Sequence, residues 1–544
     1  MIPKPSLALP MKTHALMSAA RHPRFGVIFA LILFLFACST ATADELRGWW
    51  VDTMFGNEVK TQTGIDALLG KVGDANSKGA IRNANCNAVF IQVRRRADVL
   101  YPSGVGEPYM PGLSPSNFNA LSSIIKSAHD TTGGKKRLEV HCWIVAFKTA
   151  KGQVYNQHIG TPTGDTTNFD NYWPTRLNST NGVENSDGAF DPGHPKVLEY
   201  LVNVGMDLVN FNAGGSDGGI DGIHYDYIRF EANNEGFNPT SVARYKARHG
   251  LSVDPVSSDE QFKQWRRDQV SAYVRQMYAR IQATEPWVKQ SGAFITWNPS
   301  PTTSTRSAFM GTRPYYDVYS DWDSWMQEGI LDMAVPMTYY DWASLPNDYT
   351  RWMNFQKDRK ANRHVIVGPG NYLNSLNNSI LVLQKTRDAS PAGNYAEGFC
   401  GYNYRVPYVS GTWSGFSSSL VSQVTPTWAD IPQMPWKTAP TTGHVMGTVT
   451  LAGSGAWADH ATVSITGPVN RNIVVDGTGF YTFIDLPPGS YTVSASLTGL
   501  SPVNSNVTVT AGNMVTANLA FGSDTTPPVI SNVAVGLLND ASAP

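Results

Sequence analysis

The sequence predicts an α/β fold, a (β/α)8 TIM barrel, followed by a C-terminal all-β sandwich domain. Strand-like and helix-like segments alternate through the first two thirds of the chain, which is typical of a parallel sheet with helical crossovers. The composition then changes, after a Pro- and Thr-rich stretch, to short β-rich runs. With 544 residues the chain is too long for one ordinary domain, so we expect two.

Eight short segments of the first region have the apolar, β-branched and aromatic character of buried strands. They are 46–53, 88–94, 138–147, 219–230, 292–298, 333–341, 364–370 and 398–404. Residues 196–210 repeat apolar side chains at helical spacing, and 258–285 form a longer candidate helix that Pro286 ends. Residues 151–185 are rich in Gly, Asn and Thr and predict a long loop above the barrel. Eight strands with intervening helices predict a barrel over residues 44–435.

A linker is expected at residues 436–444, and short runs separated by turn residues then predict a β-sandwich over 445–521. The segments 479–483 and 486–491 resemble the carboxypeptidase-regulatory-like (prealbumin-like) module. Residues 522–544 resemble a linker and the start of a further immunoglobulin-like module.

The N-terminal 43 residues have the pattern of a secretory signal peptide. They contain no Asp or Glu, and Lys12, Arg21 and Arg24 precede an apolar run over 25–37 and small residues at 41–43. The segment around Cys38 also resembles a lipoprotein box, which ranks second because Phe36 is bulky for that motif. We therefore expect a secreted or periplasmic (cell-envelope) protein, attached to a membrane only if Cys38 is lipidated.

Charge and cysteine content exclude several classes of function. With 42 basic and 43 acidic residues the net charge is −1, so neither a nucleic-acid partner nor a polybasic membrane patch is expected. Cys86, Cys142 and Cys400 remain after the signal segment, and we expect them to be buried small apolar residues. Their spacing matches no zinc site, so neither a metal nor another cofactor is expected.

The most informative segment is 219–230, a predicted strand that ends in a carboxylate. Alternation along a strand places Gly222, His224 and Asp226 on one face. Gly, His and Asp together make a poor apolar core, but they suit a site at the mouth of a barrel. Polar residues at the carboxyl end of a barrel strand typically serve function rather than stability.

Other predicted strands carry polar or aromatic residues on one face in the same way. If those faces point inward, the upper barrel holds a polar ring around Asp226. The residues are Arg47 and Trp49, Gln92 and Arg94, His141 and Trp143, and Met337, Tyr339 and Asp341.

Six segments together resemble the glycosyl hydrolase-like family 10 domain, in the right order, from about residue 45 to 435. They are Arg47-Gly48-Trp49-Trp50-Val51-Asp52, residues 87–94, Val140-His141-Cys142-Trp143, residues 191–195, residues 221–227 and Val335-Pro336-Met337-Thr338-Tyr339. The resemblance implies a (β/α)8 barrel, a bacterial envelope or secreted setting, and action on a polysaccharide. Met337 departs from the pattern, where many relatives carry Gln.

Two further resemblances bear on catalytic roles. The segment 221–226 is similar to the fourth-strand motif of α-amylase-type barrels, which implies that Asp226 is the nucleophile or charge stabiliser. The segment also resembles the chitinase strand, but the chitinase acid would fall at Ile228, which cannot donate a proton.

Glycoside hydrolysis normally uses two carboxyl groups. Asp341 is expected as the acid/base, with Glu107 in reserve. Arg94 and His224 are expected to orient Asp226. The expected sugar-binding residues are Arg47, Trp49, Gln92, Arg94, His141, Trp143, His224, Trp297 and Tyr339.

Structural roles compete with these functional ones. Asp226 could instead cap a helix, and Asp341 could cap or brace a loop. His141 and His224 could be hydrogen-bonded core residues. Trp49 and Trp143 could simply pack in the core. Asp321 and Asp323 are expected to cap a helix. The leading functional prediction is a secreted glycoside hydrolase cleaving O-glycosidic bonds of a polysaccharide, possibly a cell-wall glycan. The competing prediction is a non-catalytic carbohydrate-binding envelope protein on the same scaffold.

Overall fold

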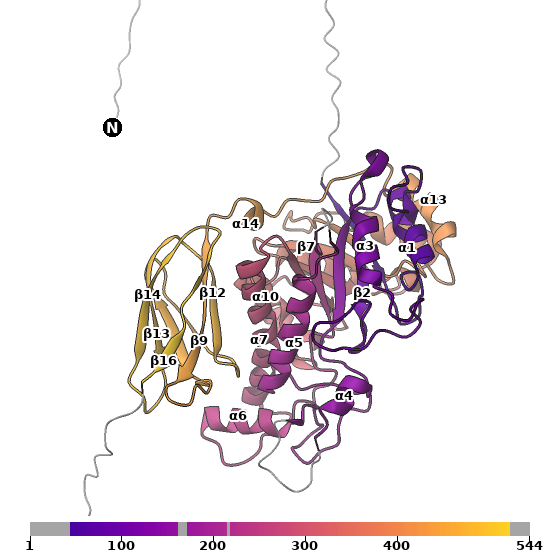
Figure 1. Ribbon diagram of the computed structural model, residues 1–544. Coiled ribbons are helices and arrows are strands. Elements are labelled where there is room, and N and C mark those ends of the chain that lie inside the picture. The colour runs from indigo at the N-terminus through magenta and orange to yellow at the C-terminus, as the bar shows by residue number, and fades with distance from the viewer. Residues whose placement is uncertain (1–43, 161–170, 215–217, 523–544) are drawn as a thin grey trace, which may run out of the picture. The chain divides into compact units, whose positions relative to one another are not determined.

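The computed structural model describes residues 44–160, 171–214 and 218–522 (Figure 1). The predicted signal peptide with Cys38, part of the long loop, and the tail from residue 523 lie outside the described residues.

The predicted barrel is confirmed. Eight parallel strands pair in sequence order, and β1 pairs with β8 to close the ring. Residues 88–94 form a strand with the bounds that the sequence predicts, whereas the fourth strand is shorter than predicted. The strands are β1 Leu46–Val51, β2 Ala88–Arg94, β3 Glu139–Val145, β4 Gly222–Asp226, β5 Lys289–Ile295, β6 Met333–Thr338, β7 His364–Pro369 and β8 Gly398–Gly401.

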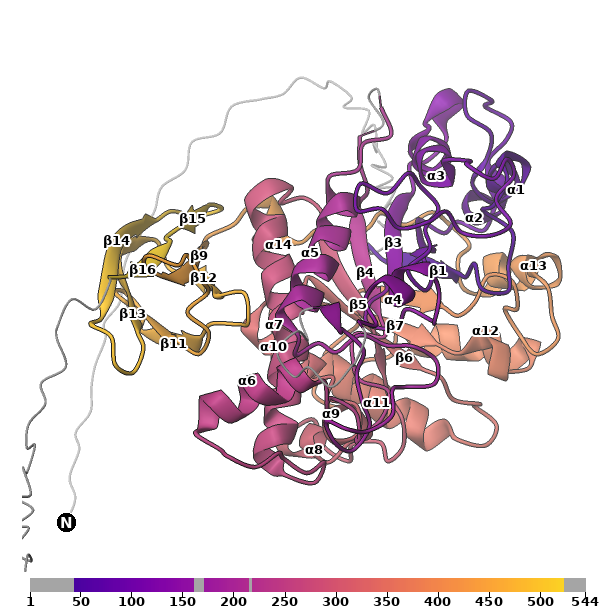
Figure 2. The same ribbon diagram turned by 60° about the horizontal axis from the view of Figure 1, so that its bottom comes forward.

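Helices surround the barrel strands (Figure 2). Residues 196–210 and 258–285 are helical as predicted, in α5 and α7. Pro195 suits the first turn of α5, where its missing N–H is not needed, and the His194 side chain accepts from the Lys196 amide. The helices are α1 Gln62–Leu69, α2 Gly79–Asn83, α3 Ala120–His129, α4 Gln153–Gln157, α5 Pro195–Val209, α6 Pro239–His249, α7 Glu260–Thr284, α8 Arg306–Met310, α9 Arg313–Tyr316, α10 Trp322–Glu328, α11 Pro346–Asp358, α12 Leu376–Lys385, α13 Trp413–Gln423 and α14 Pro435–Thr438, with 3-10 turns η1 Thr132–Gly134 and η4 Asn371–Leu373.

The region predicted as a long loop, residues 151–185, is more structured than its composition indicates. It contains α4 and several isolated bridges, including Ile159 with Tyr172 and Arg176 with Glu184. Tyr155 and Tyr172 both donate to the Glu184 carboxylate. These tertiary contacts, rather than periodicity, hold the segment.

The C-terminal region is a β-sandwich, as predicted. One sheet has the order β11-β10-β13-β14, and in the other β9 lies between β12 and β15 and also pairs with β16. Residues 514–521, at the end of the predicted sandwich, form two short strands, β15 and β16. The strands are β9 Gly443–Leu451, β10 Thr462–Thr466, β11 Arg471–Val474, β12 Phe480–Leu486, β13 Gly489–Ser496, β14 Val503–Val509, β15 Met514–Thr516 and β16 Leu519–Phe521.

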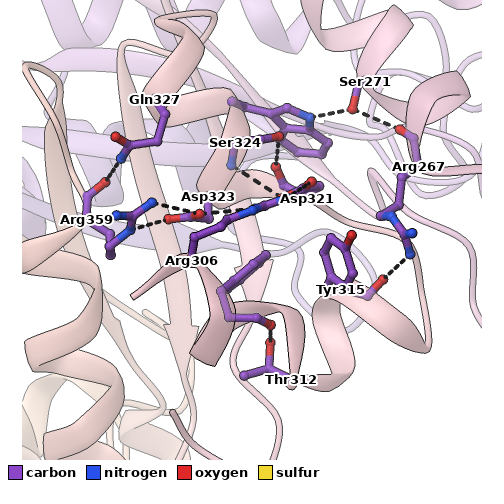
Figure 3. A network of polar contacts seen from close by, with 12 residues as sticks. Arg267, Ser271, Arg306, Thr312, Tyr315, Asp321, Asp323, Ser324, Gln327 and Arg359 are labelled. Atoms are coloured by element: carbon purple, nitrogen blue, oxygen red, sulfur yellow. Dashed lines mark hydrogen bonds and ion pairs between the residues drawn. The ribbon is translucent and has the colours of Figure 1, made fainter. Parts of the chain in front are cut away.

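An ionic network around the buried Asp323 braces α8, α10 and the end of α11 (Figure 3). Asp321 caps α10 by accepting from the Ser324 amide, as expected. Asp323 is not the cap. It lies in the first turn, fully buried, and pairs with Arg306 at 3.1 Å and with Arg359 at 2.7 Å. A buried carboxylate needs such partners, so this network holds three helices in register.

Candidate active site

A cavity of about 630 Å³ opens at the carboxyl ends of the barrel strands. This is the end at which TIM-barrel enzymes carry their active sites. Every barrel strand, or the segment that follows it, contributes a lining residue. Representative residues in strand order are Asp52, Gln92, Trp143, Asp226, Ile295, Met337, Tyr372 and Tyr402.

Asp226 ends β4 and lines this cavity, with 7% of its surface exposed. Its Oδ1 accepts from the Tyr227 amide at 2.7 Å, and its Oδ2 accepts from the Trp143 indole N–H at 3.2 Å. Tyr227 has a left-handed backbone with φ of 49°, which is uncommon for a residue with a side chain. The strand therefore ends in a sharp turn, and Asp226 and Tyr227 both line the cavity although they are adjacent.

Burial dominates the electrostatics of Asp226. It raises the pKa of this carboxyl group, because removal from water disfavours the charged form. The Arg229 charge, the Tyr227 and Trp143 hydrogen bonds and the Lys148 charge act in the opposite direction without cancelling the effect of burial. Asp226 thus favours its protonated form more than an exposed aspartate does.

A second carboxyl group in the cavity, Asp52, was missed by the sequence reasoning. It follows β1 directly, accepts from the Phe55 amide at 2.9 Å and from the Asn403 side-chain amide at 2.7 Å, and lies 4.0 Å from the Arg405 guanidinium. Asp52 and Asp226 are thus both buried carboxyl groups of one cavity, each held by two N–H donors and each near an arginine.

The face of β1 was assigned the wrong way round. Trp49 lies outside the ring, 5.0 Å from Trp413 and 5.4 Å from Phe416 between ring centroids. Arg47, on the same outer face, pairs with Glu45 at 2.6 Å. Neither residue lines the cavity. Because the outer face of a barrel strand is covered by helices and also buried, hydrophobicity alone did not distinguish the two faces.

The inner face of β1 instead carries Trp50 and leads to Asp52. The Trp50 indole donates to His224 Nε2 at 3.0 Å, so the other ring nitrogen, Nδ1, carries the proton and faces Ser291 Oγ at 2.9 Å. Burial lowers the pKa of His224 well below its ordinary value, so the ring is neutral. His224 points inward as predicted, but it supports Trp50 beneath the cavity and makes no hydrogen bond to Asp226.

On β2 the structure separates Gln92 from Arg94. Gln92 lines the cavity, where its carbonyl oxygen accepts from the Thr53 amide at 3.1 Å. An irregularity in the β2–β3 register between these two residues turns Arg94 to the outside. The prediction that Arg94 orients Asp226 is therefore wrong.

Glu107 is the partner of Arg94, at 2.7 Å, and both side chains are buried, with 0% of Arg94 and 1% of Glu107 exposed. Tyr200 also donates to Glu107. This carboxylate does not line the cavity and is held in a complete ion pair, so its prediction as a reserve acid is also wrong.

Asp341 does not line the cavity either. Its carboxylate accepts from the Ala343 amide at 3.2 Å and from the Ser344 hydroxyl at 2.8 Å, within its own turn. Asp341 therefore braces its own loop, which was the structural alternative. The prediction of Asp341 as the acid/base in the cavity is wrong. The β6 strand ends at Thr338, so the alternation used for Tyr339 and Asp341 does not extend that far.

His141 faces inward but lies deep in the barrel. It is fully buried, stacks on Phe90 with ring centroids 4.4 Å apart, and its Nε2 is 3.1 Å from Glu139. It does not line the cavity, so it fills the barrel core and is not placed to contact a substrate.

Aromatic side chains form the walls of the cavity. Trp143, Trp297 and Tyr339 line it as predicted, and Tyr402 adds a further ring stacked on Tyr339 with centroids 5.1 Å apart. Burial first, and then the charges of Asp52 and Asp226, raise the pKa of Tyr402. The Tyr402 hydroxyl therefore interacts electrostatically with both Asp52 and Asp226. Apolar ring faces beside carboxyl groups suit a sugar substrate.

Metal, thiol and membrane features add little to the site. Among the described residues no group of three or more His, Cys, Asp or Glu side chains is placed to hold a metal ion. Cys86, Cys142 and Cys400 are buried free thiols, as the sequence predicts. No helix in the described ranges has the length and apolar content needed to cross a membrane.

A closed parallel barrel with two carboxyl groups in an aromatic cavity is the arrangement expected of a glycoside hydrolase-like protein. Residues 36–386 match the family model described as Glycosyl hydrolase-like 10, and the chain belongs to this family. Residues 444–522 match the Carboxypeptidase regulatory-like domain. The expected resemblances to the glycosyl hydrolase-like family 10 domain and to the carboxypeptidase-regulatory-like module are thus confirmed.

Similar proteins include Glycosyl hydrolase YngK of Bacillus subtilis, 24% identical over 350 residues, which are 62% of this chain and 62% of YngK. Glycosyl hydrolase DigH of Escherichia coli K12 is 21% identical over 275 residues, 48% of this chain and 56% of DigH. The chain thus matches less than two thirds of the length of either relative. Among solved structures, a β-glucuronidase from Bacteroides uniformis is 10% identical, and the match covers 81% of this chain and 43% of the β-glucuronidase chain. Its TM-score of 0.27 is too low to bear on function.

Proposed function

We propose that this protein is a secreted bacterial glycoside hydrolase that cleaves O-glycosidic bonds of a polysaccharide, with cell-wall glycan as a candidate. The observation that carries the proposal is that Asp226 and Asp52 line one aromatic cavity at the carboxyl ends of the barrel strands. Membership of the Glycosyl hydrolase-like 10 family supports the reaction class. The signal-like N-terminal segment supports a location outside the cytoplasm, in the envelope or beyond it.

We assign the two carboxyl groups different roles. Glycoside hydrolysis normally uses one carboxyl group as a general acid and the other as a nucleophile or base. Burial raises the pKa of Asp226, which suits a general acid that protonates the leaving oxygen. Asp52, the second carboxyl group that lines the cavity, then takes the role of nucleophile or base. This reverses the role that the resemblance to α-amylase-type barrels implies for Asp226.

Fixed donors support the orientation of Asp226. The Trp143 indole and the Tyr227 amide hold one oxygen each, so the carboxyl plane is set before substrate binds. Such preorganisation is a general source of catalytic advantage, because less reorganisation is needed during the reaction. Trp143, Trp297 and Tyr339 supply ring faces on which sugar units can stack.

The test compares wild type with Asp226→Asn and Asp52→Asn on a panel of polysaccharides and on aryl glycosides with good leaving groups. Asp341→Asn is the matched control, a carboxylate of the same barrel end that lies outside the cavity. Loss of a general acid costs about 100- to 10,000-fold in rate on a polysaccharide. Activated aryl glycosides need little leaving-group protonation, so Asp226→Asn should retain most activity on them, whereas Asp52→Asn should lose it on both.

Three outcomes would count against this assignment. Unchanged polysaccharide turnover by Asp226→Asn removes it from the chemistry. Loss of aryl glycoside cleavage in Asp226→Asn with retention in Asp52→Asn restores the charged role to Asp226. If wild type binds polysaccharides from the panel but releases no new reducing ends, the competing function applies, a carbohydrate-binding envelope protein.

A further inference from the structure

The lining of the cavity includes cationic side chains that hydrolysis of a neutral sugar does not require. Its lining includes two carboxyl groups, Asp52 and Asp226, and five cationic side chains: Arg95, Arg96, Lys148, Arg229 and Arg313. In such a concave site a cation without a carboxylate partner favours an anionic ligand.

Several of these cations already have carboxylate partners. Arg95 pairs with Asp98 at 2.5 Å, and Arg313 pairs with Asp317 at 2.7 Å. Lys148 pairs with both Asp187 and Glu231 at 2.9 Å. These pairs reduce the charge that is available to a ligand.

Arg229 is different. Within residues 44–160, 171–214 and 218–522 no carboxylate lies within ion-pair distance of its guanidinium, and its printed hydrogen bond is from Nη1 to the Phe230 carbonyl at 3.2 Å. It lies close enough to Asp226 to lower the pKa of that group. The arginine therefore combines an unpaired charge with a position beside the reacting centre.

Aromatic rings hold the Arg229 guanidinium in place. Its central carbon lies 4.4 Å from the centroid of the Tyr227 ring and 5.6 Å from that of Trp297. Arg313 lies 4.6 Å from the same Trp297 ring. Stacking orients a planar guanidinium and leaves its N–H edge free, and that edge matches a carboxylate through two parallel hydrogen bonds.

We propose that Arg229 and Trp297 form a subsite for a sugar that carries a carboxylate, so the polysaccharide recognised here is acidic. The carboxylate binds the N–H edge of Arg229 while the sugar ring packs on Trp297. Cleavage of such a polymer rests on the proposed function, but its binding does not. The carboxylate can belong to a uronic acid ring or to an ether-linked substituent, since both present the same group to Arg229.

The experiment measures binding by calorimetry with the full chain carrying Asp226→Asn, so that the probes are not consumed. The probes are an oligogalacturonate hexamer, a carboxymethylated cello-hexaose, and the carboxyl-reduced form of the first. The first two separate a ring carboxylate from an ether-linked one. Arg229→Gln is then added, with Arg351→Gln, an exposed arginine of α11 outside the cavity, as the matched control.

At least one carboxylated probe should bind about 10- to 100-fold more tightly than the reduced form, the range expected for a charge-assisted pair. This preference should weaken as salt is raised. Arg229→Gln should abolish the preference without weakening binding of the reduced form, and Arg351→Gln should preserve it.

Equal binding of acidic and reduced probes, absence of binding by both acidic probes, or a preference that survives Arg229→Gln would each overturn the proposal. The preference of the Asp226→Asn chain that keeps Arg229 is an independent measurement should Arg229→Gln fold poorly. Binding preference without cleavage by the wild type would refute the hydrolase and leave this subsite standing. Cleavage of neutral polymers by the wild type without a binding preference for acidic probes would support the hydrolase and refute this subsite.

Discussion

The buried pair of Arg94 and Glu107 gives the sharpest test of how the barrel wall is built. In Glu107→Gln the shape of the side chain is kept, but the counter-charge of Arg94 is removed. Arg94 Nη2 lies 2.7 Å from Glu107 Oε1, with 0% and 1% of the two side chains exposed, so water cannot replace the lost charge. Breaking such a pair from one side costs about 3–5 kcal/mol in the free energy of unfolding.

The effect should be visible as a lower melting temperature with unchanged chemistry. At about 2 °C per kcal/mol for a large domain, Tm should fall by about 6–10 °C in scanning calorimetry. Replacing both partners, as in Arg94→Met with Glu107→Met, should cost less than the sum of the single replacements, because no unpaired charge is left. Glu199→Gln, an exposed glutamate of α5, is the matched control and should leave Tm nearly unchanged.

A Tm of Glu107→Gln within about 1 °C of wild type would refute the account of a dry, structural ion pair, since the expected cost is several kcal/mol. An unaltered Tm together with a large loss of hydrolysis would mean that Glu107 acts in catalysis after all.

Three further predictions concern carboxylates. Burial raises the pKa of Asp226 in the folded protein above its value of about 3.9 in the unfolded chain. The favourable contribution of the protonated Asp226 to the free energy of unfolding is therefore complete below pH about 3.9 and is lost as pH rises through the folded pKa. Asp226→Asn should therefore gain Tm relative to wild type between acidic and neutral pH, and a flat difference would contradict this. Asp323→Asn removes the counter-charge of Arg359, whereas Arg306 keeps Asp321 as a partner. The change should cost about 3 kcal/mol in urea unfolding, the low end for a buried pair because both arginines are partly exposed. A change below about 1 kcal/mol would count against the network. Asp341→Asn should change Tm and kcat/KM little, since this carboxylate braces only its own turn, and a kcat/KM loss of 100-fold or more, the scale of a lost general acid, would return it to the site.

The fold was predictable from the sequence alone, because hydrophobic segments of strand length alternate with amphipathic helices over the whole barrel region. Residues 88–94 were predicted and found as the same strand. The β4 face was also predictable, since Gly222, His224 and Asp226 are three residues that helices on the outside of a barrel would not cover well.

Which face of β1 points inward, and where Arg94 of β2 points, were decided only by tertiary structure. Strand β1 is buried on both sides, so alternation defined two faces without saying which one is the interior, and Trp49 was chosen over Trp50. Asp52 follows on the same face as Trp50, so the wrong choice of face also caused Asp52 to be overlooked. On β2 a register irregularity, which involves pairing with β3, turned Arg94 away from the cavity. Local sequence fixes the order of side chains along a strand, but closure of the ring fixes their direction, because it alone decides what each face packs against.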